Sequence, residues 1–134
     1  MTESQTPPKS FTIIHWIALV LLFLMMAQPT FDNTRALMSG KMVMGDLSID
    51  VTPAKMALHL VAMAVGWVGI VLFFKRKKLG AYASIAAHII GFVAVFTQTP
   101  EMLEMMPPAA LGVFYVILFA ITLGPIFKFK AQYA

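Results

Sequence analysis

Four long apolar runs divide this chain, with polar or basic segments between them. A helix rises about 1.5 Å per residue, so about 20 residues are needed to cross the roughly 30 Å hydrocarbon core of a bilayer. The runs are too long for strands, and within lipid the backbone has to satisfy its own hydrogen bonds, which favours helices. The pattern predicts an all-α fold, an integral membrane four-helix antiparallel bundle that forms one domain over residues 1–134. The expected spans are residues 11–27, 54–74, 79–97 and 109–127.

The composition agrees with a membrane protein. Hydrophobic residues make up 60% of the chain and charged residues 12%, with a mean hydropathy of +0.83, whereas a soluble domain carries about twice that charge. There are no cysteines, which excludes a disulfide scaffold, a zinc–thiolate centre, an iron–sulfur cluster and thiol catalysis. The first run is expected to be an uncleaved span, because only Lys9 supplies positive charge before it and Met25 stands where a cleavage site after Ala27 needs a small residue.

The basic residues are distributed unevenly between the two sides of the predicted bundle. Three of the ten, Arg35, Lys41 and Lys55, lie on one side, and the other seven lie on the side of the two termini. The positive-inside rule therefore predicts that both termini are cytoplasmic, an N-in/C-in topology. The run of four basic residues at 75–78 also suits anionic lipid head groups, which agrees with the same orientation.

The connections on the opposite side carry two further expectations. Gly45-Asp46 separates two short alternating segments, which predicts a β-hairpin with a type II′ turn within the extracytoplasmic loop, residues 28–53. Thr52 is expected to cap the second span, with Pro53 at its first helical position. The second connection on this side, residues 98–108, is short.

Small residues at helical spacing predict which helix faces turn inward, because they let membrane helices approach closely. Such residues occur in the last three spans: Ala62, Gly66 and Gly69, then Ala83, Ala87 and Gly91, then Ala120 and Gly124.

The three histidines are the main candidates for chemistry. His15, His59 and His88 all fall within spans, where polar residues are costly and are treated as functional candidates. His59 shares a helix face with Gly66 and His88 shares one with Gly91, so both are expected to point inward. Each histidine alone is explained by a hydrogen bond to a neighbouring helix. Three in a four-helix bundle favour haem, because imidazole is the usual axial ligand of haem iron there.

The depths of the histidines limit how they pair. At about 1.5 Å per residue, His15 is expected about 6 Å inside the cytoplasmic edge, His88 about 14 Å and His59 about 22 Å. Offsets of about 16 Å exclude His15 with His59 on one haem, and His88 is about 8 Å from either partner. At most one haem is expected, with His88 as the leading ligand. Without haem, the ring of His88 is expected to bridge helices through Ser84, Tyr115 or Thr122.

Three segments resemble the prokaryotic cytochrome b-561 family. The His15-Trp16 pair early in the first span resembles that family's first helix, and residues 55–66 with the basic exit at 75–76 resemble its second. Ala87-His88 with Phe92 and Pro100 resembles its third. The resemblance implies two bis-histidine haem b groups that handle electrons from quinol or superoxide. It also implies iron ligands among His15, His59 and His88, and a bacterial inner (cytoplasmic) membrane location. The family's fourth helix supplies further haem-ligating histidines, whereas residues 109–127 contain none.

The eleven methionines raise a second metal hypothesis. Three lie in each extracytoplasmic connection: Met38, Met42 and Met44, then Met102, Met105 and Met106. Clustered thioethers can hold Cu(I), for which soft ligands select. Methionine also fills irregular packing at a membrane interface, and with no cysteine nearby packing is the expected role.

Two functions from different classes follow. The first is a small membrane cytochrome b-like protein for electron transfer, with at most one haem b. The alternative is a haem-free accessory or assembly subunit that packs against other membrane subunits, or against further copies of itself, in the lipid bilayer. No basic–aromatic array for nucleic acid, no Ser/His/Asp set and no phosphate-binding glycine loop is present in the sequence.

Overall fold

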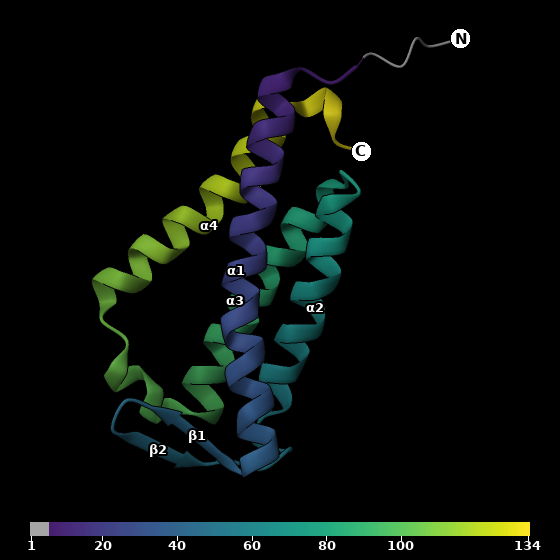
Figure 1. The fold of residues 1–134 in the computed structure, drawn as a ribbon. Helices are drawn as coiled ribbons and strands as arrows, with labels where there is room; N and C mark the ends of the chain where they lie inside the picture. The colour runs from purple at the N-terminus through teal and green to yellow at the C-terminus, as the bar shows by residue number, and fades with distance from the viewer. Residues whose placement is uncertain (1–5) are drawn as a thin grey trace.

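The computed structural model of the chain describes residues 6–134 as four long helices, one hairpin and two short 3₁₀ helices. Successive long helices run in alternating directions (Figure 1). We call the end where α1 starts and α4 finishes the terminal end, and the opposite end the hairpin end. All four long helices are long and apolar enough to cross a membrane. The elements are α1 (Lys9–Ser39), β1 (Lys41–Met44), β2 (Leu47–Asp50), α2 (Ala57–Phe74), α3 (Lys78–Gln98), η1 (Pro100–Met105), α4 (Pro108–Lys128) and η2 (Lys130–Gln132).

The first helix is longer than the sequence predicted. Residues 28–39, expected to belong to a loop, continue α1 through Pro29 to Gly40. Proline removes one backbone donor but does not end this helix. Beside it, the Thr30 hydroxyl donates to the carbonyl of Met26 and accepts from the indole N–H of Trp67. The helix stops at Gly40, whose φ of 72° and N–H bond to Ala36 form a left-handed cap.

The predicted hairpin is confirmed. β1 pairs antiparallel with β2, with Lys41 opposite Asp50 and Met44 opposite Leu47. Of the two turn residues, only Gly45 has a positive φ, 56°, as a type II′ turn requires. The predicted cap of the second span is wrong: α2 begins at Ala57, after Met56, with no side-chain cap. Pro53 lies in a turn before the helix, where the Thr52 hydroxyl accepts from the N–H of Lys55.

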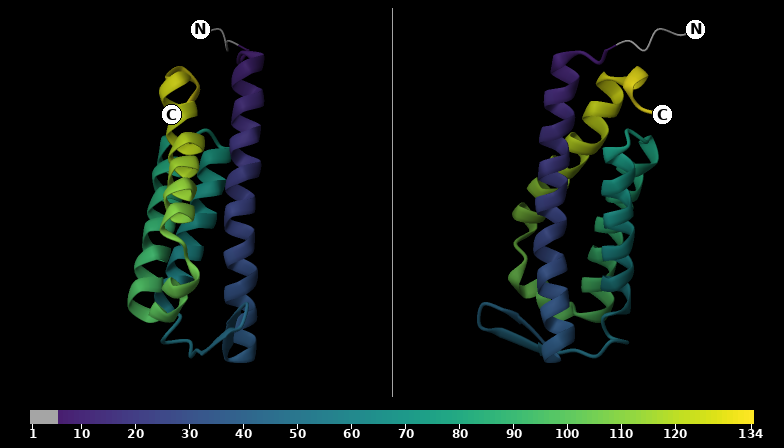
Figure 2. Two further views of the ribbon diagram at one scale, coloured as in Figure 1. Left: turned by 90° about the vertical axis from the view of Figure 1, so that its left-hand side faces the viewer. Right: turned by 45° about the vertical axis from the view of Figure 1, so that its right-hand side comes forward.

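α2 and α3 run side by side along their lengths (Figure 2). Of the small residues predicted to face inward on these two helices, five do so: Gly66 meets Ala87, Ala62 meets Gly91, and Gly69 lies against Ser84 and Gly80. Ala83 is half-buried. Near the terminal end the backbones approach so closely that a Cβ on Gly80 would overlap the backbone of Phe73.

α4 is the least buried of the four helices. It packs near the terminal end through Leu118, Thr122 and Ile126 and diverges from α1 toward the hairpin end (Figure 1). The expectation that Ala120 and Gly124 face inward is wrong, because both are exposed and a Cβ on Gly124 would meet nothing within 4 Å. The bulky and polar residues of the opposite face make the contacts instead.

Candidate functional site

A cavity of about 650 Å³ lies toward the hairpin end. Its size falls in the usual range of ligand pockets, about 300–1,000 Å³. α1, α2, α3 and α4 provide its walls, while β1 and η1 border its end. Apolar residues dominate the lining, and the charged groups come from the last turns of α1 and the start of β1. We call it the hairpin-end cavity; the lining includes Asp32, Arg35, Lys41, His59, Ala62, Met63, Ala87, His88, Gly91, Phe92, Leu111, Phe114 and Tyr115.

His88 lines this cavity, and one nitrogen of its ring has no hydrogen-bond partner. Its Nδ1 lies 2.7 Å from the carbonyl oxygen of Ser84, and because a carbonyl only accepts, Nδ1 carries the proton of the neutral ring. Nε2 then bears a lone pair. Within residues 6–134, it is the one buried side-chain nitrogen or oxygen without a hydrogen-bond partner. The ring also packs against Phe114, with the ring centroids 5.4 Å apart.

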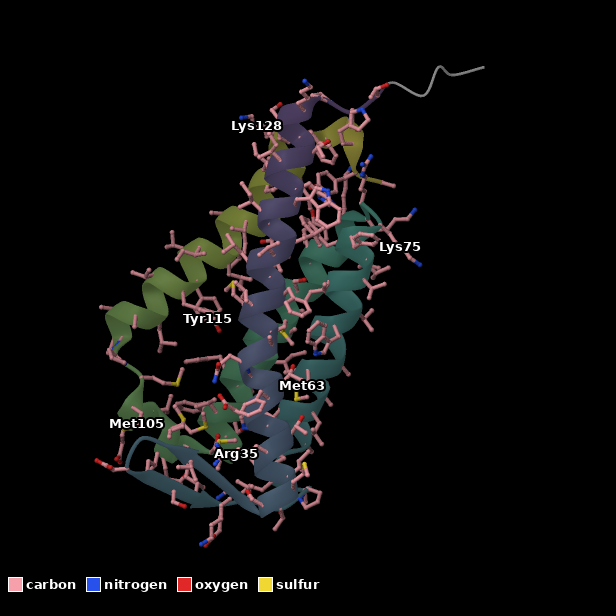
Figure 3. The ribbon with its side chains drawn as sticks, in the orientation of Figure 1. Arg35, Met63, Lys75, Met105, Tyr115 and Lys128 are labelled. Carbon is pink, nitrogen blue, oxygen red and sulfur yellow. The ribbon has the colours of Figure 1, made fainter. Side chains whose placement is uncertain are left out.

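The expected interhelical bridge through the His88 ring is wrong. Ser84 lies on the same helix as His88, and the Tyr115 hydroxyl donates to the backbone carbonyl of His88, at 3.1 Å, and not to its ring. The Thr122 hydroxyl donates to the carbonyl of Leu118 within its own helix. Figure 3 shows Tyr115 on the side of α4 that faces the other helices. The helices are therefore joined through the backbone of His88, which leaves the ring free for another role.

His59 lines the same cavity but has its ring in a hydrogen-bond chain. Its Nε2 lies 3.1 Å from Oγ1 of Thr99, and the Thr99 hydroxyl donates to the sulfur of Met102 at 3.1 Å. Because that hydroxyl has a single proton, His59 is the donor to Thr99 through Nε2–H. The inward orientation predicted for His59 is confirmed, since 5% of the residue is exposed.

The two cavity histidines lie at different levels. Ala62 stands opposite Gly91 and Gly66 opposite Ala87, so His59 is level with residue 94 of α3. That is six residues, or about 9 Å, from His88. The structure brings these two histidines to one cavity and keeps the offset that the sequence predicts.

His15 lies apart from the cavity, near the terminal end. Its ring stacks between Phe11 and Phe73, at centroid distances of 5.3 and 5.1 Å. Its Nδ1 lies 2.7 Å from the hydroxyl of Tyr133. The backbone of Ala134 pairs with Arg76, which fixes the segment that carries Tyr133. Tyr133 was not among the residues predicted from the sequence, where its only signal is that it is an aromatic residue after the last apolar run.

Tyr133 provides a test of this cluster. Burial raises the pKa of Tyr133 to about 12, against the opposing charge of Arg76. Because the folded pKa exceeds the usual value of about 10, the cluster stabilises the fold fully below about pH 10, and that contribution is lost as the pH rises through about 12. We expect the phenolate absorbance that disappears in Tyr133→Phe to develop only above about pH 11. A titration midpoint near pH 10 for that difference signal would contradict the burial of Tyr133.

No group of three or more His, Asp or Glu side chains placed to hold a metal ion occurs within residues 6–134. Comparison with protein-family models, curated protein sequences and solved structures gave no match to this chain. The features that suggest a function are therefore the hairpin-end cavity and the unpaired Nε2 of His88.

Proposed function

We propose that this chain is a small multi-pass membrane protein of the cytochrome b type, which transfers electrons through one haem b in the hairpin-end cavity with His88 as iron ligand. The observation that carries the proposal is the state of the His88 ring. Metal-ligating histidines typically donate the other ring N–H to a carbonyl or carboxylate, and Nδ1–H of His88 donates to Ser84. The remaining lone pair has no partner within the protein, a condition that otherwise costs about 1–3 kcal/mol.

The rest of the cavity suits the same ligand. Its walls include Phe92, Phe114 and Leu111, which exclude water from a planar apolar macrocycle. Arg35 and Lys41 line the end near the hairpin, where cations suit the two carboxylates that haem b carries. A bound haem b would supply a one-electron carrier, while the bond from His88 to Ser84 would hold the imidazole in one orientation.

We further propose an N-in/C-in orientation in a bacterial inner membrane. Figure 3 shows Lys75 and Lys128 toward the terminal end and Arg35 toward the hairpin end, in line with the seven-to-three division of basic residues in the sequence. This orientation puts the hairpin-end cavity toward the extracytoplasmic side.

One observation favours the alternative of a haem-free accessory subunit. The small-residue face of α4, with Gly112, Ala120 and Gly124, is exposed along its length, and such faces suit close approach of another membrane helix. This alternative needs no ligand in the cavity and assigns the lone pair of His88 no role.

The absorption spectrum separates the two functions. We expect the full-length protein, purified in detergent from haem-replete cells, to show a Soret band that shifts on dithionite reduction, with one haem per chain. If the protein lacks this band and also fails to take up added haemin, the cytochrome proposal is wrong and the accessory role is favoured.

A further inference from the structure

Methionines from distant parts of the chain converge on the hairpin-end cavity. Seven of the eleven methionines line it. Five of the seven come from β1 and from η1 with the residue after it, about 60 residues later. The sequence alone does not show that these two groups meet. We call the five the thioether cluster: Met42, Met44, Met102, Met105 and Met106.

Contacts between the hairpin and η1 hold the cluster together. Met102 packs against the small core that contains Met42. The terminal methyl of Met105 reaches the turn beside Met44, since a Cβ on Gly45 would lie 3.3 Å from it. Met42 and Met44 are two residues apart on one strand, so their side chains leave the same face. Figure 3 shows Met105 next to the hairpin.

The burial of the cluster is graded. Met42 is buried, Met44, Met102 and Met106 are half-buried, and 46% of Met105 is exposed. The cluster is therefore open to the surroundings at Met105 and enclosed at Met42.

We propose that the thioether cluster binds one Cu(I) ion. Thioether sulfur is a soft, neutral ligand that selects Cu(I) over divalent ions such as Zn²⁺, which prefer imidazole, thiolate and carboxylate. A monovalent ion also costs less to transfer into an apolar site than a divalent one. Thr99 donates to the sulfur of Met102 and so positions that thioether through the chain from His59. This inference rests on methionines alone and goes beyond the proposed haem function.

The test measures Cu(I) affinity of the full chain in detergent, under anaerobic reducing conditions, by competition with a chromogenic Cu(I) chelator. We expect one Cu(I) per chain, displacement by Ag(I), no competition from Zn²⁺, and sulfur scatterers in the copper X-ray absorption spectrum. Met102→Leu with Met105→Leu should weaken binding by about tenfold or more, since even loss of a group that supports a metal ligand costs about 10- to 100-fold. Leucine conserves volume and hydrophobicity, so the fold should persist.

Two controls make the test specific. Met38→Leu should leave the affinity unchanged, because Met38 lies on the same side of the molecule but is 85% exposed and does not line the cavity. His88→Ala should also leave it unchanged, so failure of the haem proposal does not affect this one. If the double variant fails to fold, Met105→Leu alone, at a half-exposed position, should still weaken binding. Absence of stoichiometric Cu(I) in the native chain, or full affinity in the folded methionine variants, would overturn the proposal.

Discussion

Replacing His88 with alanine is expected to abolish the Soret band of the purified protein. In our proposal the unpaired Nε2 of His88 is the atom that binds iron, and alanine offers no donor in its place. Haem content per chain, measured from the absorbance of a pyridine extract against protein concentration, should fall from about one to near zero, because removing an axial ligand removes the main bond between the protein and the iron. The far-UV circular dichroism should stay unchanged, since the helices are joined through the backbone of His88 and the hydroxyl of Tyr115.

Two variants make this result specific to the imidazole. His59→Ala should retain the haem, because His59 lies about 9 Å further along the helix pair and its Nε2 is engaged with Thr99. His88→Gly should lose the haem and regain the Soret band when imidazole is added, since the small molecule fits the space that the ring leaves. Full haem content in His88→Ala would instead transfer the ligand role to His15 or His59.

The same position distinguishes the haem-free alternative by stability. Without a ligand, the buried Nε2 of His88 is only a cost of about 1–3 kcal/mol. If the protein is a haem-free accessory subunit, His88→Leu should raise the free energy of unfolding in detergent. The substitution removes the unpaired atom and keeps an apolar side chain beside Phe114. Under the haem reading, the same variant loses the cofactor and its stabilisation.

Much of the fold could be predicted because long hydrophobic runs are typical of helices that are long and apolar enough to cross a membrane. The bounds of α3 and α4 differ from the expected spans by one residue at each end. The extension of α1 could not be predicted, because a proline such as Pro29 normally ends a helix. The contact between Thr30 and Trp67 beside it forms only in the tertiary structure. The error on α4 has a related cause: small residues indicate close packing without specifying whether the partner lies in the same chain.

The sequence predicted the histidines of the candidate site, but it did not predict which residues meet at the cavity. The depths calculated from the helix rise predicted that His15 and His59 lie too far apart to share a haem. The structure places His15 in an aromatic cluster away from the cavity. The convergence of β1 with η1 depends on a hairpin folding across the end of the bundle, which no local pattern reports. Contacts between residues far apart in the chain are the hardest to predict from a single sequence.

Introducing one methyl group at Gly80 is expected to disrupt the α2–α3 pair and to destabilise the protein severely. A Cβ at this position would overlap the backbone N and Cα of Phe73 and lie 2.7 Å from the carbonyl oxygen of Gly69. Backbone atoms cannot rotate away as a side chain can, so the helices would have to separate. Such overpacking costs about 1–3 kcal/mol where side chains yield and more where they do not, so we expect Gly80→Ala to lose more than about 3 kcal/mol.

Gly124→Ala is the matched control for that change, because it adds the same methyl group to a helix at a position where a Cβ meets nothing within 4 Å. There the higher helix propensity of alanine should leave stability unchanged or raise it by up to about 1 kcal/mol. Thermal unfolding in detergent, followed by the fluorescence of Trp16 and Trp67, compares the two variants directly. Equal melting temperatures for Gly80→Ala and the native chain would mean that α2 and α3 do not approach as described. A large drop in melting temperature confined to Gly80→Ala would show that the close α2–α3 contact is important for stability. The same contact sets the relative level of His59 and His88.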